Sequence, residues 1–386
     1  MERTRLVLGA MTGTSIDGID LALAEIRGSG LPMSARLAAF RSAPLGTLAM
    51  RLRAAADQQP ITAGELAELS RELGELHARE ASELLREAAV PRIDLAAIHG
   101  QTVFHRPPTS LQLLNAHPIA AALGCDVVFD LRGQDLALGG QGAPLTPLSD
   151  WVLYRAPHAR AVVNLGGFAN ATILAADQGA PPARQVAAIH GADLCACNQL
   201  LDRAARAAIG RDFDADGAVA ASGQRHERAF AELSALLAPQ PGARSLGTGD
   251  EAFAWIDRHL GALAPADLLA TAADAIGSAI GRALATRGVA DAVLAGGGAR
   301  HARLARAIAH AAGVAVQPSD RLGIPVAARE ALGWAVLGAL AQDGTDVSLP
   351  RVTHRPAMTP DSALPRPIPG TWLRIRTADE CGLNRY

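Results

Sequence analysis

The chain has 386 residues, of which 49% are hydrophobic and 19% are charged, and its formal net charge at pH 7 is −2. This length predicts two domains rather than one small module, and the composition is typical of globular chains with sizeable cores. Because no basic block stands out, we expect a small-molecule ligand and expect neither nucleic acid nor a membrane as a partner.

All 36 basic residues are arginine, because the sequence contains no lysine. Walker-A nucleotide binding needs a lysine on the phosphates and Schiff-base chemistry needs a lysine amine, so both classes are excluded. Four cysteines in a chain of this length fit a reducing compartment, so we assign no disulfides and expect a cytoplasmic protein. The apolar run at the start of the chain is too short to predict a signal peptide.

Two hairpins of one design are expected in the chain. Residues 4–26 predict a strand, a glycine-rich turn and a second strand, because apolar residues alternate and an Asp-Gly pair closes the turn. Residues 161–175 repeat this order around a Gly-Gly pair. The repetition predicts two related halves.

Helices and further strands separate the hairpins. Leucines at three- and four-residue spacing predict an amphipathic helix over 62–89, which Thr62 and Glu65 open as a capping box. Strands are expected at 94–98, 126–130 and 291–295, and helices at 118–124, 198–209, 224–237, 250–260, 266–287, 300–312 and 326–341. This alternation predicts an α/β fold. A proline-rich tail is expected to return to the first domain, so that residues 1–150 and 345–386 form one domain and 151–344 the other.

Three glycine-rich turns could carry chemistry. The turn from Thr12 to Asp20 offers backbone amides and hydroxyls to phosphate oxygens, and Asp17 or Asp20 could hold magnesium through water. Gly166 and Gly167 could approach the other side of a polyphosphate, and Gly296–Gly298 could lie against a nucleotide base or ribose. The alternatives are ordinary tight turns, or a Rossmann-like element that lacks the full G-x-G-x-x-G spacing.

Five stretches resemble, in the same order, the anhydro-N-acetylmuramic acid kinases of the actin-like ATPase and sugar kinase superfamily. They are Gly9–Asp20, His99–Thr102, Asp130–Arg132 continuing to Gly139–Leu145, Asn164–Asn170, and Ala295–Ala299. The resemblance spans roughly residues 5–355. It implies a two-domain, ribonuclease H-like α/β fold with the active-site cleft between the domains, and a homodimer.

The resemblance also implies an activity. Such a kinase opens 1,6-anhydro-N-acetylmuramic acid with water and phosphorylates O6 from ATP and Mg²⁺, giving N-acetylmuramic acid 6-phosphate in cell-wall recycling. The chemistry needs a carboxylate base for the water, and charge stabilisation on the transferred phosphoryl group. The implied base is Asp193. The implied sugar-side residues are Arg132, Glu330, His99, Gln101 and Asn198, and the implied nucleotide-binding residues are Gly13, Thr14, Ser15, Ile16, Asp17, Gly18, Ile19, Asp20, Gly166, Gly167, Gly296, Gly297 and Gly298.

Two segments depart from the family pattern. The D-T-G-P-x-N segment reads Asp193-Leu194-Cys195-Ala196-Cys197-Asn198, so the turn that aims the carboxylate differs. The K-S-x-G-R-E-like segment, near 244–251, lacks the lysine and the following arginine. The alternative function is therefore a paralogue that binds ATP and a related sugar as a sensor or acts on another substrate. A nicotinamide-dependent Rossmann enzyme is the third possibility.

Each implied residue also has a plain structural alternative. Asp193 could be a loop carboxylate or a helix cap, and Arg132 could form an ordinary ion pair with Asp130 or Asp135. Glu330 could lie on a solvated helix face. His99 could be a satisfied core histidine, and we expect it to support the site rather than act as an acid. Trp334 and Leu337 fit the core better than a stacking platform.

Overall fold

The computed structural model describes residues 3–13, 15–238, 250–356 and 368–375, and it divides the chain into two compact units. Unit 1 comprises Met1–Leu153 and Ala328–Tyr386, and unit 2 comprises Tyr154–Ala327. Both units combine a mixed sheet with helices, so the predicted α/β class is confirmed. The chain returns to unit 1 at Ala328 rather than near residue 345, because the helix that follows packs on the first strand of unit 1.

The sheet of unit 1 has six strands in the order β13-β7-β4-β1-β2-β3. They are β1 (Thr4–Thr12), β2 (Gly18–Arg27), β3 (Ser34–Pro44), β4 (Leu95–Ile98), β7 (Asp126–Phe129) and β13 (Thr371–Leu373). β1 and β2 form the first predicted hairpin, and β3 extends it as an antiparallel edge. Because β4 and β7 run parallel to β1, the carboxyl ends of these three strands meet at one edge of the sheet.

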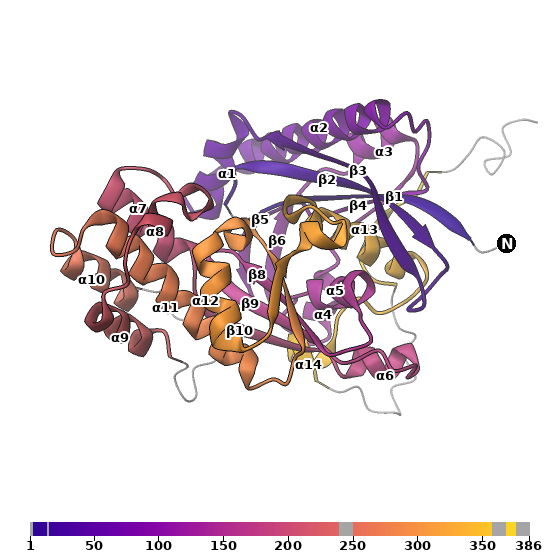
Figure 1. The fold of residues 1–386 in the computed structure, drawn as a ribbon. Coiled ribbons are helices and arrows are strands. Elements are labelled where there is room, and N and C mark those ends of the chain that lie inside the picture. Colours follow the sequence, from indigo (N-terminus) through magenta and orange to yellow (C-terminus); the bar gives the residue numbers. More distant parts are fainter. Residues whose placement is uncertain (1–2, 14, 239–249, 357–367, 376–386) are drawn as a thin grey trace, which may run out of the picture. The chain divides into compact units, whose positions relative to one another are not determined.

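Helices cover both faces of this sheet. The two longest are α2 (Ala63–Glu87) and α13 (Arg329–Gln342); shorter ones are α1 (Leu48–Ala56), α3 (His117–Leu123), α4 (Gly133–Ala137), α5 (Thr146–Tyr154) and α14 (Pro350–Thr353). Figure 1 shows α2 and α3 along one face of the β1–β3 sheet. Leu8 and Ala10 of β1 join the core under α2, whereas Gly9, between them, faces α13. A small hairpin of β5 (Gln101–Arg106) and β6 (Thr109–Leu113) completes the unit.

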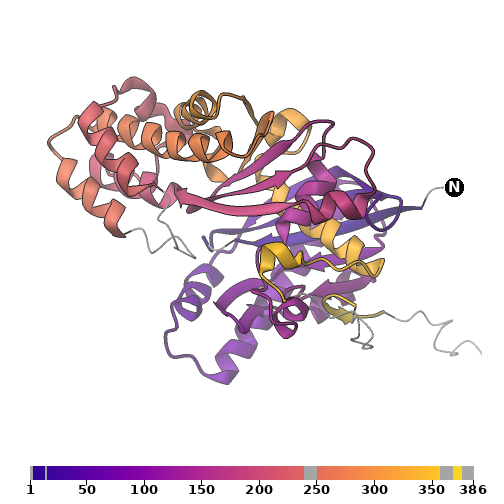
Figure 2. The ribbon, with the colours of Figure 1, turned by 90° about the horizontal axis from the view of Figure 1, so that it is seen from below.

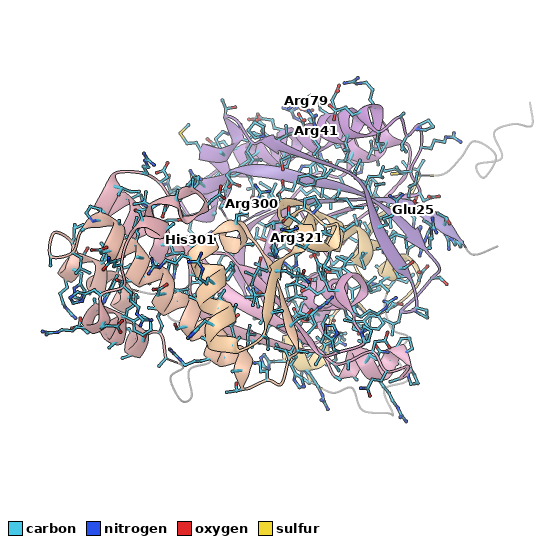
Figure 3. All side chains as sticks on the ribbon, viewed as in Figure 1. Glu25, Arg41, Arg79, Arg300, His301 and Arg321 are labelled. Atoms are coloured by element: carbon cyan, nitrogen blue, oxygen red, sulfur yellow. The ribbon has the colours of Figure 1, made fainter. Side chains whose placement is uncertain are left out.

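Charged residues line the outer part of the β1–β3 sheet. Glu25 of β2 pairs with Arg27 and Arg36, and Arg41 of β3 pairs with Glu80 of α2 at 2.9 Å. Figure 3 shows Arg41 and Arg79, which also contacts Glu80, above the sheet at α2. Charges at an edge strand oppose edge-to-edge association.

Unit 2 has a five-stranded sheet in the order β10-β9-β8-β11-β12. Its strands are β8 (Arg160–Leu165), β9 (Phe168–Leu174), β10 (His190–Ala196), β11 (Asp291–Ala295) and β12 (Ala315–Pro318). Its helices are α6 (Pro182–Ala187), α7 (Asn198–Ile209), α8 (Ala218–Ser222), α9 (Glu227–Leu236), α10 (Asp250–His259), α11 (Pro265–Ala285) and α12 (Ala302–Ala312). Four 3-10 turns lie at η1 (Ala215–Gly217), η2 (Gly297–Arg300), η3 (Ser319–Leu322) and η4 (Val326–Ala328). Figure 2 shows α11 and α12 stacked beside the sheet, and α11 packs most extensively on α12.

Helix α11 is the most apolar long helix among the described residues. Its length and composition would suffice to cross a membrane, but 67% of that window is buried within the protein. Small side chains let it approach α12 closely, because a Cβ on Gly277 or Gly281 would lie 2.5–2.9 Å from atoms of α12. Helix α11 is therefore a core helix of unit 2.

Most elements predicted from the sequence are present, including both hairpins and the capping box of α2. The prediction missed β3, α1, the β5–β6 hairpin, α5, β10 and β12. β3 and β12 are edge strands with mostly exposed or half-buried residues, so they lack the apolar alternation that marks a strand. β10 carries polar residues and a bulge, which break the same alternation.

Replacing Gly9 by alanine should lower the free energy of unfolding by about 3 kcal/mol, because the added methyl group overpacks β1 against α13. A Cβ at this position would lie 1.9 Å from the Ala331 carbonyl oxygen and 2.4 Å from the Ala335 nitrogen. Urea unfolding followed by circular dichroism measures the loss. Gly64→Ala in α2 is the control, because a Cβ there meets only Thr62 Oγ1 at 4.0 Å. Equal stability of Gly9→Ala and wild type would contradict this packing.

Candidate functional site

The carboxyl edge of the unit 1 sheet brings together His99 and Arg132, two of the residues predicted to face the sugar. Thr12 ends β1, His99 follows β4, and Arg132 follows β7. The Thr12 hydroxyl donates to the Gly100 carbonyl at 2.6 Å, which ties the end of β1 to the segment after β4. Ligands of open α/β sheets bind at this type of edge.

Arg132 is held by two neutral acceptors. Its Nε and Nη2 donate to His99 Nε2 at 3.2 Å and 3.1 Å, and its Nη1 donates to the Gly142 carbonyl at 2.9 Å. No carboxylate lies within ion-pair distance of the guanidinium among the described residues. Burial lowers the pKa of Arg132 to about 10, against the weaker opposing effect of Asp130 and Glu330. Arg132 therefore presents a desolvated charge that no carboxylate of the described residues pairs with.

His99 is fixed as a neutral imidazole. A guanidinium can only donate, so Nε2 must be the acceptor, and Nδ1 then donates to the Gly100 carbonyl at 2.9 Å. Burial and, to a smaller extent, the Arg132 charge lower the pKa of His99 to about 3. The ring also contacts Trp334 of α13, with ring centroids 4.7 Å apart. This geometry makes His99 a support for Arg132, as expected from the sequence, rather than an acid.

A buried carboxylate organises the loop that supplies the second acceptor. Asp135 is fully buried and accepts from the Gly142 amide at 2.8 Å and from the Thr353 hydroxyl at 2.8 Å. Gly140 must be glycine here, because its Cβ would lie 2.2 Å from an Asp135 oxygen. Asp135 thus fixes the Gly142 carbonyl that Arg132 contacts. The ion pair of Asp135 with Arg132, considered from the sequence, is not formed among the described residues; Asp135 accepts from Gly142 and Thr353 instead.

Glu330 is the second residue of α13 and lies next to a buried ion pair. Its neighbour Arg329 donates twice to one Asp150 oxygen, at 3.0 Å and 2.7 Å, and both side chains are buried. Burial raises the pKa of Glu330, as do the Asp20 and Asp150 charges, whereas Arg329 and Arg132 lower it. Glu330 is therefore partly buried and electrostatically coupled to Arg132, not on a solvated helix face.

The first glycine turn, described except for Thr14, keeps its carboxylates in local hydrogen bonds. Ser15 donates to Asp17 at 2.9 Å, and the Ser42 hydroxyl donates to Asp20. Burial raises the pKa of Asp20, and the nearby Asp17 charge raises it further, while the Ser42 bond lowers it. A hollow of about 320 Å³ opens there, lined by Asp17, Gly18, Asp20, Ser42, Ala43 and Pro44. Among the described residues no group of three potential metal ligands is assembled, so the magnesium site stays a prediction.

The turn between β8 and β9 is fastened to the first turn of α7. The Asn198 amide donates to the Gly166 carbonyl at 2.9 Å, and the Cys197 amide donates to the Gly167 carbonyl at 2.8 Å. Helix α7 has no side-chain cap, so these carbonyls satisfy its first N–H groups. The amides of Gly166 and Gly167 have no partner in the described part of the chain, and a Cβ on Gly167 would meet nothing within 4 Å.

The third glycine turn, Gly296–Gly298, packs against the end of β8 and the start of α7. Gly296, at φ 78°, would bring a Cβ to 2.7 Å from Asn164 Oδ1, and Gly298 would bring one to 2.7 Å from Asn198 Oδ1. Asn164 Oδ1 is buried and has no hydrogen-bond partner among the described atoms. Arg300 and His301, labelled in Figure 3, follow this turn directly. Unit 2 therefore brings together both of its predicted glycine turns and Asn198.

Asp193 and Asn198 do not share a turn. Asp193 lies within β10, opposite Asn170 of β9, and is exposed. No hydrogen bond of its carboxylate is present among the described residues. Leu194 to Cys197 are all buried, and Asn198 begins α7. The segment expected from the sequence to form a loop or a helix cap is a bulged strand that runs into a helix.

The structure says less about the roles of the remaining predicted site residues. Gln101 is fully buried, its Nε2 donates to the Thr102 carbonyl, and its Oε1 has no partner among the described atoms. Ile16 adopts a positive φ of 53°, and Ile19 is buried in β2. Thr14 and most of the departing 244–251 segment lie outside the described residues.

Comparison with known proteins gives one consistent family. The sequence profile of anhydro-N-acetylmuramic acid kinase matches residues 5–359. Proteins of that name are 35% identical in Salinibacter ruber, 37% in Bordetella pertussis and 35% in Azorhizobium caulinodans. These alignments cover 95%, 90% and 94% of this chain and 97%, 93% and 99% of the relatives. Among solved structures, a ROK family glucokinase from Streptomyces griseus in complex with glucose and AMPPNP aligns with 86% of this chain and 99% of its own, at 12% identity and a TM-score of 0.37.

The His99 imidazole should stay neutral down to about pH 4, because its pKa lies at about 3. The unfolded chain binds this proton near the ordinary value of 6.5, so the stability that neutral His99 contributes is lost as the pH falls from 6.5 toward 3. NMR of ¹⁵N-histidine-labelled protein should show one ring that keeps its Nδ1–H tautomer from pH 8 to pH 4, and His99→Gln identifies its signals. A midpoint for this ring between pH 5 and 7 would contradict the assignment.

Proposed function

We propose that this chain, which belongs to the anhydro-N-acetylmuramic acid kinase family, opens 1,6-anhydro-N-acetylmuramic acid with water and phosphorylates it at O6 from ATP. The chain is accordingly a carbohydrate kinase with a two-unit α/β fold. None of the matches favours a nicotinamide enzyme or the altered paralogue. We further propose cytoplasmic localisation and a homodimer, which sedimentation velocity tests.

The proposed reaction balances in one event. A water oxygen bonds to C1 of the sugar, the C1–O6 bond breaks, and O6 bonds to the γ-phosphorus of ATP. The bond from that phosphorus to the β–γ bridging oxygen then breaks, so ADP leaves, and one water proton goes to the Asp193 carboxylate. The products are N-acetylmuramic acid 6-phosphate and ADP.

The observation that carries the substrate assignment is the Arg132 guanidinium. It is partly buried, oriented by His99 and Gly142, and lacks a carboxylate partner among the described residues. Isolated charges of this kind are costly unless a ligand of opposite sign completes them. The lactyl carboxylate of N-acetylmuramic acid is such a ligand, and a planar guanidinium suits it. Glu330, coupled to Arg132, would then face water or a hydroxyl.

Residues of both units fit a nucleotide. The free amides of Gly166 and Gly167 suit phosphate oxygens, and the bare backbone of Gly296–Gly298 suits the base or ribose. Mg²⁺, bound through water to Asp17 or Asp20, would supply charge neutralisation on the phosphates. These residues provide the donors without any lysine.

Product analysis tests the activity directly. Purified protein is incubated with ATP, Mg²⁺ and 1,6-anhydro-N-acetylmuramic acid, and the products are identified by mass spectrometry and ³¹P NMR. We expect a sugar whose mass has increased by one water and one phosphoryl group, formed together with one equivalent of ADP. ATP binding without any such product would favour the paralogue that acts as a sensor.

Asp193→Asn should slow turnover by about 10²- to 10⁴-fold while the affinities for ATP and sugar stay nearly unchanged, because asparagine has a similar shape but accepts no proton. Steady-state kinetics and calorimetry separate these effects. Asp202→Asn is the control, since Asp202 lies within α7, about one helical turn past Asn198. Equal losses in both variants would indicate structural damage, and full activity of Asp193→Asn would assign the base to another residue.

Arg132→Ala should raise the KM for the sugar about 10- to 100-fold with little change in kcat, because it removes a charged contact made in ground and transition states alike. Initial-rate kinetics at saturating ATP measure the change. Arg106→Ala is the matched control, because Arg106 is exposed and lies over the Phe104 ring at 5.5 Å. A collapse of kcat at constant KM would disprove the carboxylate-binding role.

A further inference from the structure

The Asn198 side chain holds the backbone of the glycine turn between β8 and β9. Its Nδ2 donates to the Leu165 carbonyl at 2.7 Å, and its own amide donates to the next carbonyl, that of Gly166, at 2.9 Å. One residue therefore binds two consecutive peptide groups from the same side. Its Oδ1 accepts only a weak bond, from Cys197 Sγ at 3.6 Å.

Because the peptide bond is planar, these contacts also determine the direction in which the Gly166 and Gly167 N–H groups point. In a trans peptide the N–H points opposite to the C=O of the same unit. The Leu165 carbonyl belongs to the peptide that carries the Gly166 N–H, and the Gly166 carbonyl belongs to the one that carries the Gly167 N–H. Because both carbonyls face Asn198, both N–H groups point away from it. They are the two unpartnered amides that suit phosphate oxygens.

The same side chain meets the third glycine turn. A Cβ on Gly297 would lie 3.4 Å from Asn198 Nδ2, and one on Gly298 would lie 2.7 Å from Oδ1. Asn198 is therefore wedged between the two glycine turns of unit 2, and its polar atoms are directed at the protein rather than at a ligand.

We propose that Asn198 is a positioning residue for the phosphate-binding amides of Gly166 and Gly167. This inference rests on the proposed use of ATP, and it replaces the sugar contact that the family resemblance implies for Asn198. The residue acts through the turn and touches no substrate. Its loss therefore affects the nucleotide and leaves the sugar unaffected.

Asn198→Leu, which keeps the volume but removes the Nδ2 donor, tests the proposal. The KM for ATP should rise roughly 10-fold or more, since a buried carbonyl loses its partner and the turn relaxes, while the KM for the sugar stays within about twofold. Binding of a fluorescent ATP analogue, measured without sugar, should weaken by the same factor. Gln199→Met is the matched control. Gln199 is the next residue of α7, and its Nε2 has no partner among the described atoms, so both KM values should match wild type.

Other outcomes would overturn the proposal. A raised KM for the sugar at unchanged ATP affinity would establish direct sugar contact, and equal rises in both would indicate general damage to unit 2. If Asn198→Leu does not fold, Asn198→Ser repeats the test, because its shorter side chain places no donor at the Nδ2 position. Unchanged ATP affinity in Asn198→Ser then overturns the proposal. Failure of the wild-type protein to bind the ATP analogue is a separate result, which would refute the proposed function itself.

Discussion

The planarity of the peptide bond links the two sides of each glycine turn. When a hydrogen bond fixes the carbonyl of a peptide group on one side of a turn, the N–H of the same group points to the other side. Contacts on the carbonyl side therefore orient the N–H groups that face a ligand. In unit 2 the contacts come from Asn198 and the first amides of α7, which themselves need acceptors because the helix has no side-chain cap. The turn caps the helix and the helix orients the turn, so neither is stable in this geometry without the other.

In unit 1 different contacts hold the glycine turn in place. Its first glycine turn is held by a side chain: Arg53 of α1 donates from Nη2 to the Ser15 and Ile16 carbonyls, at 3.0 Å and 3.4 Å. These carbonyls flank a β-branched residue at a positive φ of 53°, a conformation that such residues rarely adopt. Strained backbone persists only where surrounding contacts determine it, and Arg53 supplies two of them. The two hairpins thus share a design in strand order but differ in what holds the turn.

Among the described arginines of unit 1, Arg132 differs from the buried Arg5 and Arg329 in having no carboxylate partner. Arg329 and Arg5 are buried with carboxylate partners, Asp150 and Asp343, at 2.5 Å and 2.7 Å. Arg132 instead receives the neutral acceptors His99 and Gly142, which orient a guanidinium without cancelling its charge. A carboxylate in place of His99 would stabilise the free protein but compete with an anionic substrate. On the proposed role of Arg132, the low pKa of His99 favours substrate binding, since a protonated ring could not accept from Arg132.

Elements with local sequence signals could be predicted, whereas contacts between residues far apart in the chain could not. The β1–β2 and β8–β9 hairpins and the capping box of α2 follow from alternation and turn chemistry within a few residues. The role of Asp135, and the orientation of Asn198, depend on partners far along the chain, Thr353 and Leu165, and no local pattern reports them. Position in the family motif implied a sugar contact for Asn198 and gave no indication of its bond to the Leu165 carbonyl.

The segment Asp193-Leu194-Cys195-Ala196 differs from the family pattern, and the packing of its apolar residues explains the structure that it adopts. A Thr-Gly-Pro sequence would form a turn by local conformational preference, whereas Leu194, Cys195 and Ala196 are 6%, 2% and 6% exposed and belong to the core of unit 2. Between Asp193 and Cys195 the register with β9 shifts, so that Leu194 is an extra residue and the strand bulges. Bulges commonly redirect a side chain beside an active site. Here the bulge leaves Asp193 exposed while the residues that follow it stay buried, so burial of these apolar residues determines where the Asp193 carboxylate lies. On the proposed role of Asp193 as the base, substitutions that enlarge Cys195 or Ala196 should lower turnover, because they displace the bulged strand that carries this carboxylate.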